Sequence, residues 1–231
     1  YIMDQEGKKG RKFRHEFILN GINQRGSSLT GRNFVDSPPD LFNEIEPEYY
    51  DEWVTAYFQK AIEQKKNGKP VTPEKLGILA DKLRERVEKN WKSMDLELPN
   101  IPMFVYREFI EDVVLRRTWD GKMGENLVQK WLKEELNHLV INAPRGIDAE
   151  YGVDLVIMIK ENVWIGIQVK PQKSGLAPMS HVVSQTHKKQ HADFEKKFSG
   201  KVFWAQYEHG KGADKNPELL ESIKAEIKRL S

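Results

Sequence analysis

The sequence predicts an α/β fold in which an N-terminal helical region precedes a mixed central β-sheet flanked by helices. Two observations predict this fold. Between residues 47 and 117 the apolar side chains recur at spacings of three and four, which is the helical period. Beyond residue 124, one helical pattern is followed by short apolar runs that are interspersed with further helical patterns, an order typical of α/β domains.

Each predicted element follows from a local pattern. Glycine, arginine and small polar residues crowd residues 20–32, so the stretch 1–46 is predicted to be an arm or loop with at most a short helix. Periodic apolar residues predict the helices 47–68, 72–94, 105–117, 124–136, 180–198 and 217–230, and short apolar runs predict the strands 139–142, 153–159, 163–169 and 202–207. We therefore expect an arm at 1–46, a helical region at 47–121 and a core at 122–231.

The composition restricts the possible chemistry. Cysteine is absent, which excludes disulfides and thiolate catalysis and leaves oxygen or imidazole ligands for any metal, a set that favours Mg²⁺. The net charge is only +2, from 37 Lys and Arg against 35 Asp and Glu, so DNA would have to be held by local basic clusters. No apolar run is long enough to span a membrane and the first residues lack a signal-peptide core, so we expect a cytoplasmic protein.

The runs 153–159 and 163–169 are predicted to form a β-hairpin, because the link between them is short and contains an asparagine suited to a turn. Strand side chains alternate between two faces, so the register decides which residues meet. Centring the turn on Glu161 pairs only apolar residues on one face, namely Leu155 with Ile167, Ile157 with Ile165 and Ile159 with Val163. The apolar pattern therefore selects this register.

The same register brings three polar side chains together on the other face. Asp154 lies opposite Gln168, and Lys170 shares the face of Gln168 while Val169 points away. A slip of one residue would set Asp154 against Val169 and bury Gln168 among aliphatic side chains. Carboxylate and amide oxygens can ligate Mg²⁺, and a lysine ammonium can hold the attacking water and stabilise charge on a scissile phosphate. A carboxylate, an amide and a lysine ammonium on one face therefore indicate phosphodiester hydrolysis.

These residues resemble the PD-(D/E)xK nuclease superfamily, which includes type II restriction endonucleases, Holliday junction resolvases and repair nucleases. Asp154 is similar to its first acid, and Gln168 to Lys170 are similar to its second half, with glutamine where most members have an acid. The segment from Gly124 to Val128 resembles the first core helix, which implies that Glu125 reaches the metal site. The resemblance covers about residues 122–207 and implies a restriction-endonuclease-like core that uses Mg²⁺.

The leading hypothesis is a type II restriction endonuclease that acts as a homodimer on double-stranded DNA and reads its sequence with loops outside the core. One alternative is a Holliday junction resolvase or DNA repair nuclease. Another is a non-catalytic DNA-binding module with a degenerate nuclease core, for which Gln168 in place of an acid would be the first sign. The ordinary explanations are a solvent-facing set on a hairpin for the central trio and a plain N-terminal helix acid for Glu125.

Two further groups of residues are candidate contacts. His187 and His191 share a predicted helix face and suit either a metal site or, more commonly for histidines beside lysines, a solvated or DNA-facing surface. Arginine, lysine and asparagine side chains of the N-terminal arm, with one lysine after the catalytic strand, have the residue types that contact bases and phosphates. The predicted DNA contacts are Arg11, Lys12, Arg14, Asn23, Arg25, Arg32 and Lys173.

Overall fold

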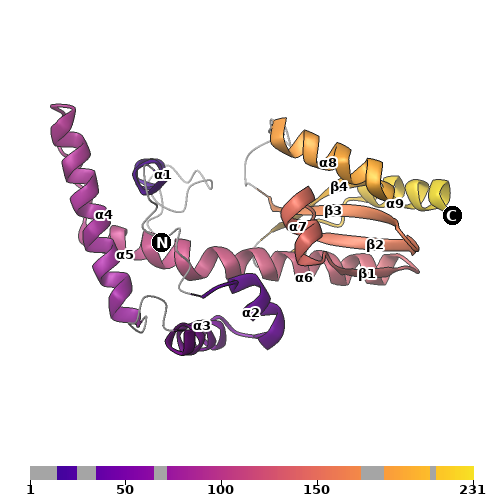
Figure 1. Cartoon of the computed structure of the whole chain (residues 1–231), viewed down its shortest axis with the longest axis horizontal. Helices are drawn as coiled ribbons and strands as arrows, with labels where there is room; N and C mark the ends of the chain where they lie inside the picture. Colours follow the sequence, from indigo (N-terminus) through magenta and orange to yellow (C-terminus); the bar gives the residue numbers. More distant parts are fainter. Residues whose placement is uncertain (1–14, 25–34, 65–71, 173–184, 209–211) are drawn as a thin grey trace. The chain divides into compact units, whose positions relative to one another are not determined.

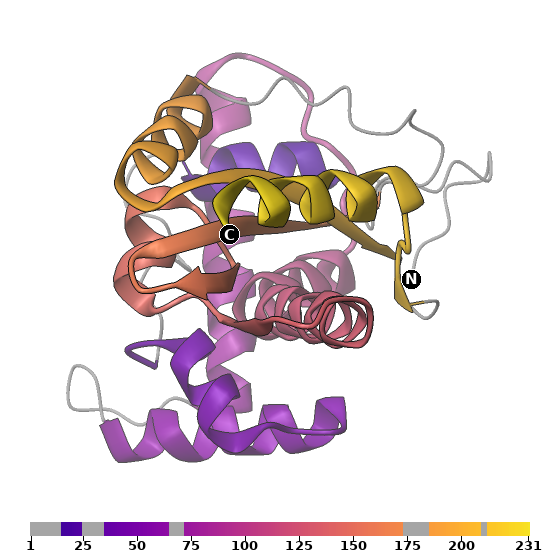
Figure 2. The ribbon, with the colours of Figure 1, turned by 90° about the vertical axis from the view of Figure 1, so that its right-hand side faces the viewer.

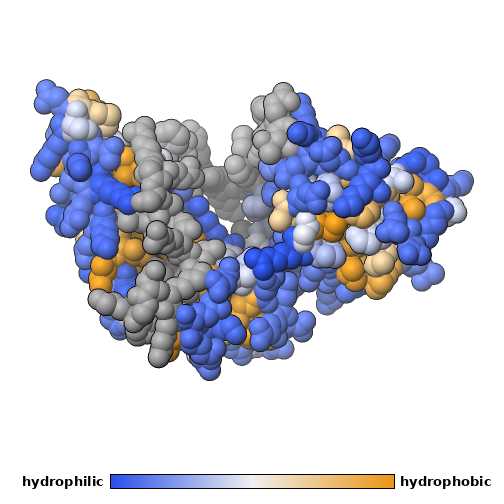
Figure 3. Space-filling view, viewed as in Figure 1, coloured by the Kyte–Doolittle hydropathy of each residue, from blue (hydrophilic) through white to orange (hydrophobic). Residues whose placement is uncertain are grey.

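The computed structural model describes residues 15–24, 35–64, 72–172, 185–208 and 212–231. The chain divides into two compact units, Tyr1–Trp119 and Asp120–Ser231 (Figure 1), and each unit is described by itself. In both units, the face seen in Figure 3 is mainly hydrophilic and is interrupted by smaller apolar areas. Across the described ranges, no helix combines the length and the apolar character that crossing a bilayer requires.

The first unit is helical. Its elements are α1 (Glu16–Gln24), α2 (Pro38–Ile45), α3 (Tyr50–Gln64), α4 (Pro73–Ser93), α5 (Met103–Glu111) and a π-helical turn (Asp112–Arg116). The fully buried side chains of Trp53, Tyr57, Leu83 and Phe109 form much of its interior. The Trp53 indole N–H donates to the Leu115 carbonyl at 3.1 Å, which satisfies the one polar atom of this buried ring.

The helical region departs from the sequence predictions at three places. The stretch predicted as an arm contains α1 and also α2, which begins after Ser37 because the Ser37 hydroxyl accepts from the Asp40 N–H. Helix α3 begins at Tyr50 rather than at Pro47. The helices predicted at 105–117 and 124–136 form one continuous helical segment, in which the π-helical turn joins α5 to α6 (Arg117–Glu135).

The second unit is built on a five-stranded mixed sheet, so the predicted α/β core is confirmed. The strands are β1 (Leu139–Asn142), β2 (Leu155–Lys160), β3 (Val163–Pro171), β4 (Ser199–Glu208) and β5 (Gly212–Ala213), in the spatial order β1-β2-β3-β4-β5. Strands β3 and β4 are parallel and the other neighbours are antiparallel. The helices are α6, α7 (Arg145–Tyr151), α8 (Gln185–Phe198) and α9 (Pro217–Leu230). Helix α7 and strand β5 were not predicted.

Helices cover both faces of this sheet. On one face α6 and α9 pack on the odd-numbered residues of the hairpin, such as Leu155 and Ile167, in the larger apolar cluster. On the other face α7 and α8 pack on Val156, with Phe194 and Phe198 of α8 at the centre of the second cluster. Figure 1 shows α6 and α8 on opposite sides of the sheet, and Figure 2 shows the same unit from its end, with α9 lying along the sheet. The even-numbered face carries this second apolar cluster and also the polar side chains of Asp154 and Gln168.

The β2–β3 register agrees with the prediction over most of its length. Leu155 pairs with Ile167 and Ile157 pairs with Ile165, as expected. The expected pairing of Ile159 with Val163 is wrong, since Lys160 pairs with Val163 and the register shifts between Met158 and Lys160. The turn closes over two residues, with Asn162 at φ 57°, and the irregularity absorbs the extra residue. This shift lies at the turn, at the opposite end of the hairpin from Asp154.

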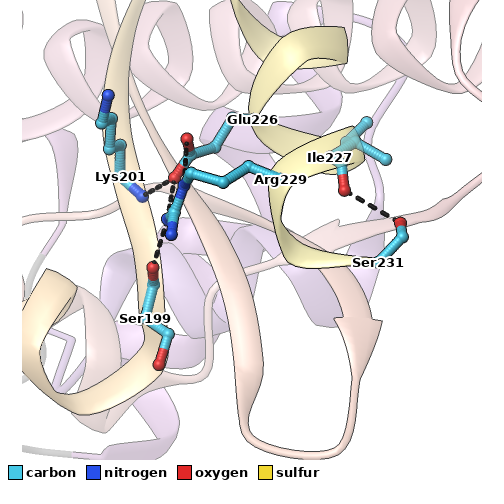
Figure 4. Close-up of polar contacts among 6 residues, drawn as sticks. All are labelled: Ser199, Lys201, Glu226, Ile227, Arg229 and Ser231. Atoms are coloured by element: carbon cyan, nitrogen blue, oxygen red, sulfur yellow. Dashed lines mark hydrogen bonds and ion pairs between the residues drawn. The ribbon is translucent and has the colours of Figure 1, made fainter.

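A buried carboxylate joins α9 to the start of β4 (Figure 4). The Glu226 side chain, in a residue that is only 4% exposed, accepts from the Lys201 N–H at 3.0 Å and from the Arg229 guanidinium. Arg229 also donates to the Ser199 carbonyl at 2.6 Å. The last helix is therefore held to the sheet by polar contacts as well as by apolar packing.

Candidate active site

The backbone places Asp154 at the entrance of β2. Helix α7 ends at Gly152, whose φ of 64° lies in the left-handed region that glycine adopts at little cost. The Asp154 N–H then donates to the Ile167 carbonyl at 2.9 Å, and the Asp154 carbonyl accepts from the Ala143 N–H at 2.9 Å. Both neighbouring strands thus hold the Asp154 backbone, and its side chain lies on the even-numbered face.

The side chains of Asp154 and Gln168 meet as the register predicted. The Gln168 Nε2 donates to Asp154 Oδ2 at 2.9 Å, and the same oxygen accepts from the Val169 N–H at 2.6 Å. Burial raises the pKa of Asp154, and the Val169 N–H and the nearby charge of Lys170 oppose that rise. The aspartate, the glutamine and the lysine are therefore brought together at the same end of the hairpin.

Glu125, on helix α6, interacts electrostatically with Asp154. Burial raises the pKa of Glu125 to about 7, against the opposing effect of Lys122, and the negative charges of Asp154 and Asp148 raise it further. Lys122 forms an ion pair with Glu125 at 2.5 Å, and the side chains of both residues are largely buried, at 11% and 13% exposure. The charges of Glu125 and Asp154 therefore influence each other, and the reach of Glu125 to a metal site stays a prediction.

The close approach of α6 to β4 depends on Gly124. A Cβ atom at this position would lie only 2.2–2.5 Å from three ring carbons of Tyr207, so no larger residue fits without movement of the ring or the helix. The Tyr207 hydroxyl donates to the Asp120 carbonyl at 2.9 Å, which fixes the ring against the start of this part of α6. Gly124 is thus the residue that lets the neighbouring Glu125 approach the sheet.

The donors gathered here fit a divalent cation. Glu125 and Asp154 supply two carboxylates, and Gln168 supplies a buried amide oxygen that has no hydrogen-bond partner among the described residues. Oxygen ligands of this kind are those that Mg²⁺ takes in proteins, usually together with water and phosphate oxygens. Within the described residues, no three side chains of His, Cys, Asp or Glu are placed to hold a metal by themselves. The amide of Gln168 is therefore an important part of the candidate ligand set.

Helix α8 and strand β4 form a wall beside this group. The rings of His187 and His191 stack with their centroids 6.3 Å apart, so the predicted shared face is confirmed, and both rings contact Trp204. Trp204 pairs in register with Gln168, and Gln206 with Lys170. Burial lowers the pKa of His191, and its hydrogen bond with the Gly152 backbone acts in the opposite direction. The two histidines lie against an aromatic side chain here, and their role as metal ligands remains a hypothesis.

Several residues near the centre were not found from the sequence. Lys122 precedes Glu125 by three positions, a spacing that signals a helical ion pair. Asp148, Gln190 and Trp204 had no such signal, because α7 was not predicted and the packing of α8 on the sheet depends on the tertiary fold. These residues are therefore visible only in three dimensions.

The predicted DNA contacts are mostly outside the part of the chain that the structure describes. Arg11, Lys12, Arg14, Arg25, Arg32 and Lys173 all lie there. Asn23 is described, and it lies in α1 with a side chain that is buried in a residue only 5% exposed. A DNA contact by Asn23 would require this side chain to become accessible, and it remains a prediction.

The model of the MjaI restriction endonuclease family matches residues 16–225. The chain belongs to this family. The MjaI restriction endonuclease match extends over the helical unit as well as the sheet, whereas the resemblance in the motifs covered only about residues 122–207. Searches of curated proteins and of solved structures found no match. Membership in the MjaI family supports a restriction endonuclease, an enzyme that cuts DNA.

Proposed function

We propose that this protein is a type II restriction endonuclease that hydrolyses phosphodiester bonds of double-stranded DNA at a specific sequence and depends on Mg²⁺. The observation that carries the proposal is the convergence of Asp154, Gln168 and Lys170 at one end of a hairpin, in a chain of the MjaI family. The family match supports DNA as the substrate. The metal, the sequence specificity and the residue roles are part of the proposal.

The proposed roles follow from the chemistry of the side chains. Asp154, Gln168 and Glu125 would hold the ion, which when bound supplies positive charge at the scissile phosphate and lowers the pKa of a bound water. Lys170 holds the attacking water and stabilises the negative charge that builds on the phosphate oxygens. The water oxygen forms a bond to phosphorus, the bond to the leaving sugar oxygen breaks, and that oxygen takes up a proton.

The partial burial of the site favours this chemistry. Glu125 has a side chain that is 13% exposed, and Gln168 is 4% exposed, so charges here act in surroundings with little water. Electrostatic interactions are stronger in such surroundings than in bulk water. Lys170 keeps partial exposure at the edge of the group, where a phosphate can reach it.

Cleavage of plasmid and of a long natural DNA tests the proposal. The wild type is expected to give discrete fragments with Mg²⁺ and none with EDTA. Asp154→Ala and Lys170→Ala are each expected to lower the cleavage rate by at least about 100-fold, the scale of removing one group that stabilises developing charge.

Matched controls keep this test specific. Glu221→Ala and Lys224→Ala remove an exposed ion-paired couple on α9, which packs on the opposite sheet face, and both should leave cleavage unchanged. A smear instead of discrete bands would contradict sequence specificity. Activity on branched DNA alone would assign the protein to the resolvase alternative, and uncut DNA across a range of sequences and temperatures would favour the binding-module alternative.

A further inference from the structure

The amide of Gln168 has its nitrogen, not its oxygen, against the aspartate. Gln168 Nε2 donates to Asp154 Oδ2 at 2.9 Å, while Gln168 Oε1 is buried and, within the part of the chain that the structure describes, has no hydrogen-bond partner. An ion held by both side chains needs the amide oxygen, because the amide nitrogen has no lone pair to offer. A half-turn of the amide about its last side-chain bond exchanges the two ends. This half-turn is the change that would prepare Gln168 to bind the ion.

Gln190 of α8 supplies the acceptor that the turned amide needs. Gln190 Oε1 and Gln168 Oε1 both lie 3.4 Å from the point that a Cβ atom on Gly152 would occupy. The Gln190 Nε2 donates to the Glu150 carbonyl at 3.2 Å, which fixes the orientation of this second amide and directs its oxygen toward the same space. Both carbonyl oxygens therefore border the space beside Gly152, and neither can donate a hydrogen bond to the other.

We propose that Gln190 is a positioning residue that holds Gln168 in the orientation that binds a divalent cation. After the half-turn, Gln168 Nε2 takes the place of Oε1 and donates to Gln190 Oε1, while Gln168 Oε1 faces the side of Asp154. The turned amide exchanges its hydrogen bond to Asp154 for one to Gln190, and its oxygen is then placed to ligate an ion shared with Asp154. The proposal rests on the proposed function, in which Asp154 and Gln168 share the ion.

This arrangement gives a physical reason for glutamine at position 168. A glutamate there could ligate an ion, but it has no hydrogen to donate and would set a negative charge against Gln190 Oε1. Glutamine offers an oxygen at one end and a donor at the other, so it can contact an ion and Gln190 together. Gly152 belongs to the same arrangement, since its missing side chain leaves the space that both amides face.

The test compares Gln190→Met with Gln129→Met in the full chain. Methionine keeps the length of the side chain and removes the amide. Gln129 is a matched control because its Nε2 also donates to a backbone carbonyl, that of Val140 at 3.3 Å, from a different helix. Ca²⁺ binding is measured by calorimetry, and unfolding in EDTA reports the structural cost. Gln190→Met is expected to weaken Ca²⁺ binding by about 10-fold, as loss of residues that orient metal ligands does, and Gln129→Met to leave it unchanged.

A second variant separates positioning from a structural role. In a Gln168→Glu variant, residue 168 has no N–H that could donate a hydrogen bond to Gln190. The additional substitution Gln190→Met should therefore cause no further loss of Ca²⁺ affinity. The side-chain ¹⁵N–H signals of Gln168 should shift on addition of Mg²⁺ in the wild type and shift less in Gln190→Met. The inference would be overturned if Gln190→Met lowered Ca²⁺ affinity equally with and without Gln168→Glu. It would also be overturned if Mg²⁺ shifted the Gln168 signals equally in the wild type and in Gln190→Met.

The Asp154→Ala variant separates the two proposals. If the wild type binds Ca²⁺ and Asp154→Ala does not, while Gln190→Met binds as well as Gln129→Met, the positioning role is wrong and the proposed function stands. If Asp154→Ala binds Ca²⁺ as the wild type does, the shared ion is wrong and both proposals fall.

Discussion

Burial controls the charge of the carboxylates at the candidate centre. The pKa of Glu125 rises to about 7, chiefly because burial penalises its charged form, and Lys122 only partly offsets this effect. The pKa of Asp154 is raised for the same first reason. When burial makes a carboxylate costly to ionise in the free protein, a bound cation stabilises its ionised form most, because the ion replaces the solvation that burial removed.

Glu125→Gln should remove a measurable part of the pH dependence of stability. The pKa of Glu125 is about 7 in the folded protein against a reference value of 4.5, so the folded state binds the extra proton and stability falls as the pH rises between these values. Without divalent ions, the free energy of unfolding of the wild type should fall by on the order of 2 kcal/mol more than that of Glu125→Gln between about pH 5 and pH 8. Chemical unfolding in EDTA measures this free energy. Parallel pH profiles of the wild type and Glu125→Gln would contradict the burial of this carboxylate.

At the residue scale, the sequence predicted the central trio well. Asp154 and Gln168 meet because the apolar pattern selects the register at this end of the hairpin, and that pattern is local. Gln190 has no such pattern, since it contributes through the packing of α8 against α7. Residues that act through a neighbouring element leave no periodic trace in the sequence.

At the scale of elements, the contact of α6 with β4 determines where Glu125 lies. Gly124 permits the contact, and the ring of Tyr207 fills the space that a side chain at Gly124 would need. The prediction of two separate helices, ending at 117 and beginning at 124, was wrong, because the helix continues through Gly121 and Gly124. Tertiary packing overrides the weak helix propensity of glycine here, so the helix continues through both positions.

Gly124→Ala should destabilise the protein by about 1–3 kcal/mol, the range for forcing extra atoms into a packed site. Gly121→Ala is the control on the same helix, because a Cβ atom there meets nothing within 4 Å. This second substitution should stabilise by up to about 1 kcal/mol, the difference in helix propensity between alanine and glycine. Urea unfolding of both variants measures the effect, and equal shifts would contradict the contact with Tyr207.

Elements with strong local patterns were predicted closely, and others were not. Helix α9 has the predicted bounds, Pro217–Leu230, because Asn216 caps it and apolar residues follow at helical spacing. Helix α7 was missed because its seven residues are too short for a periodic pattern. The shift near Met158 was missed because a two-residue turn is preferred to the longer link that was expected.

At the scale of the whole molecule, the family match covers residues in both compact units. The helical unit is therefore part of what defines this family.

We predict that two copies of the chain bind one specific duplex. The physical reason is that one centre of this type cuts one strand, and a two-fold symmetric dimer places two centres on the two strands. With Ca²⁺ in place of Mg²⁺, sedimentation of the protein with a duplex that carries the cleavage site should give two chains per duplex. A duplex of equal length without the site serves as the control, and one chain per specific duplex would contradict the homodimer.

The sequence by itself determined the α/β class, the hairpin register away from its turn, and the shared end of the hairpin at which Asp154, Gln168 and Lys170 lie, because periodic apolar residues specify which face of a strand is buried. Only the tertiary structure decided that one continuous helix carries Glu125 to the sheet and that the amides of Gln190 and Gln168 both lie beside Gly152. These arrangements depend on contacts between residues far apart in the chain, and such contacts have no local periodicity from which they could be inferred.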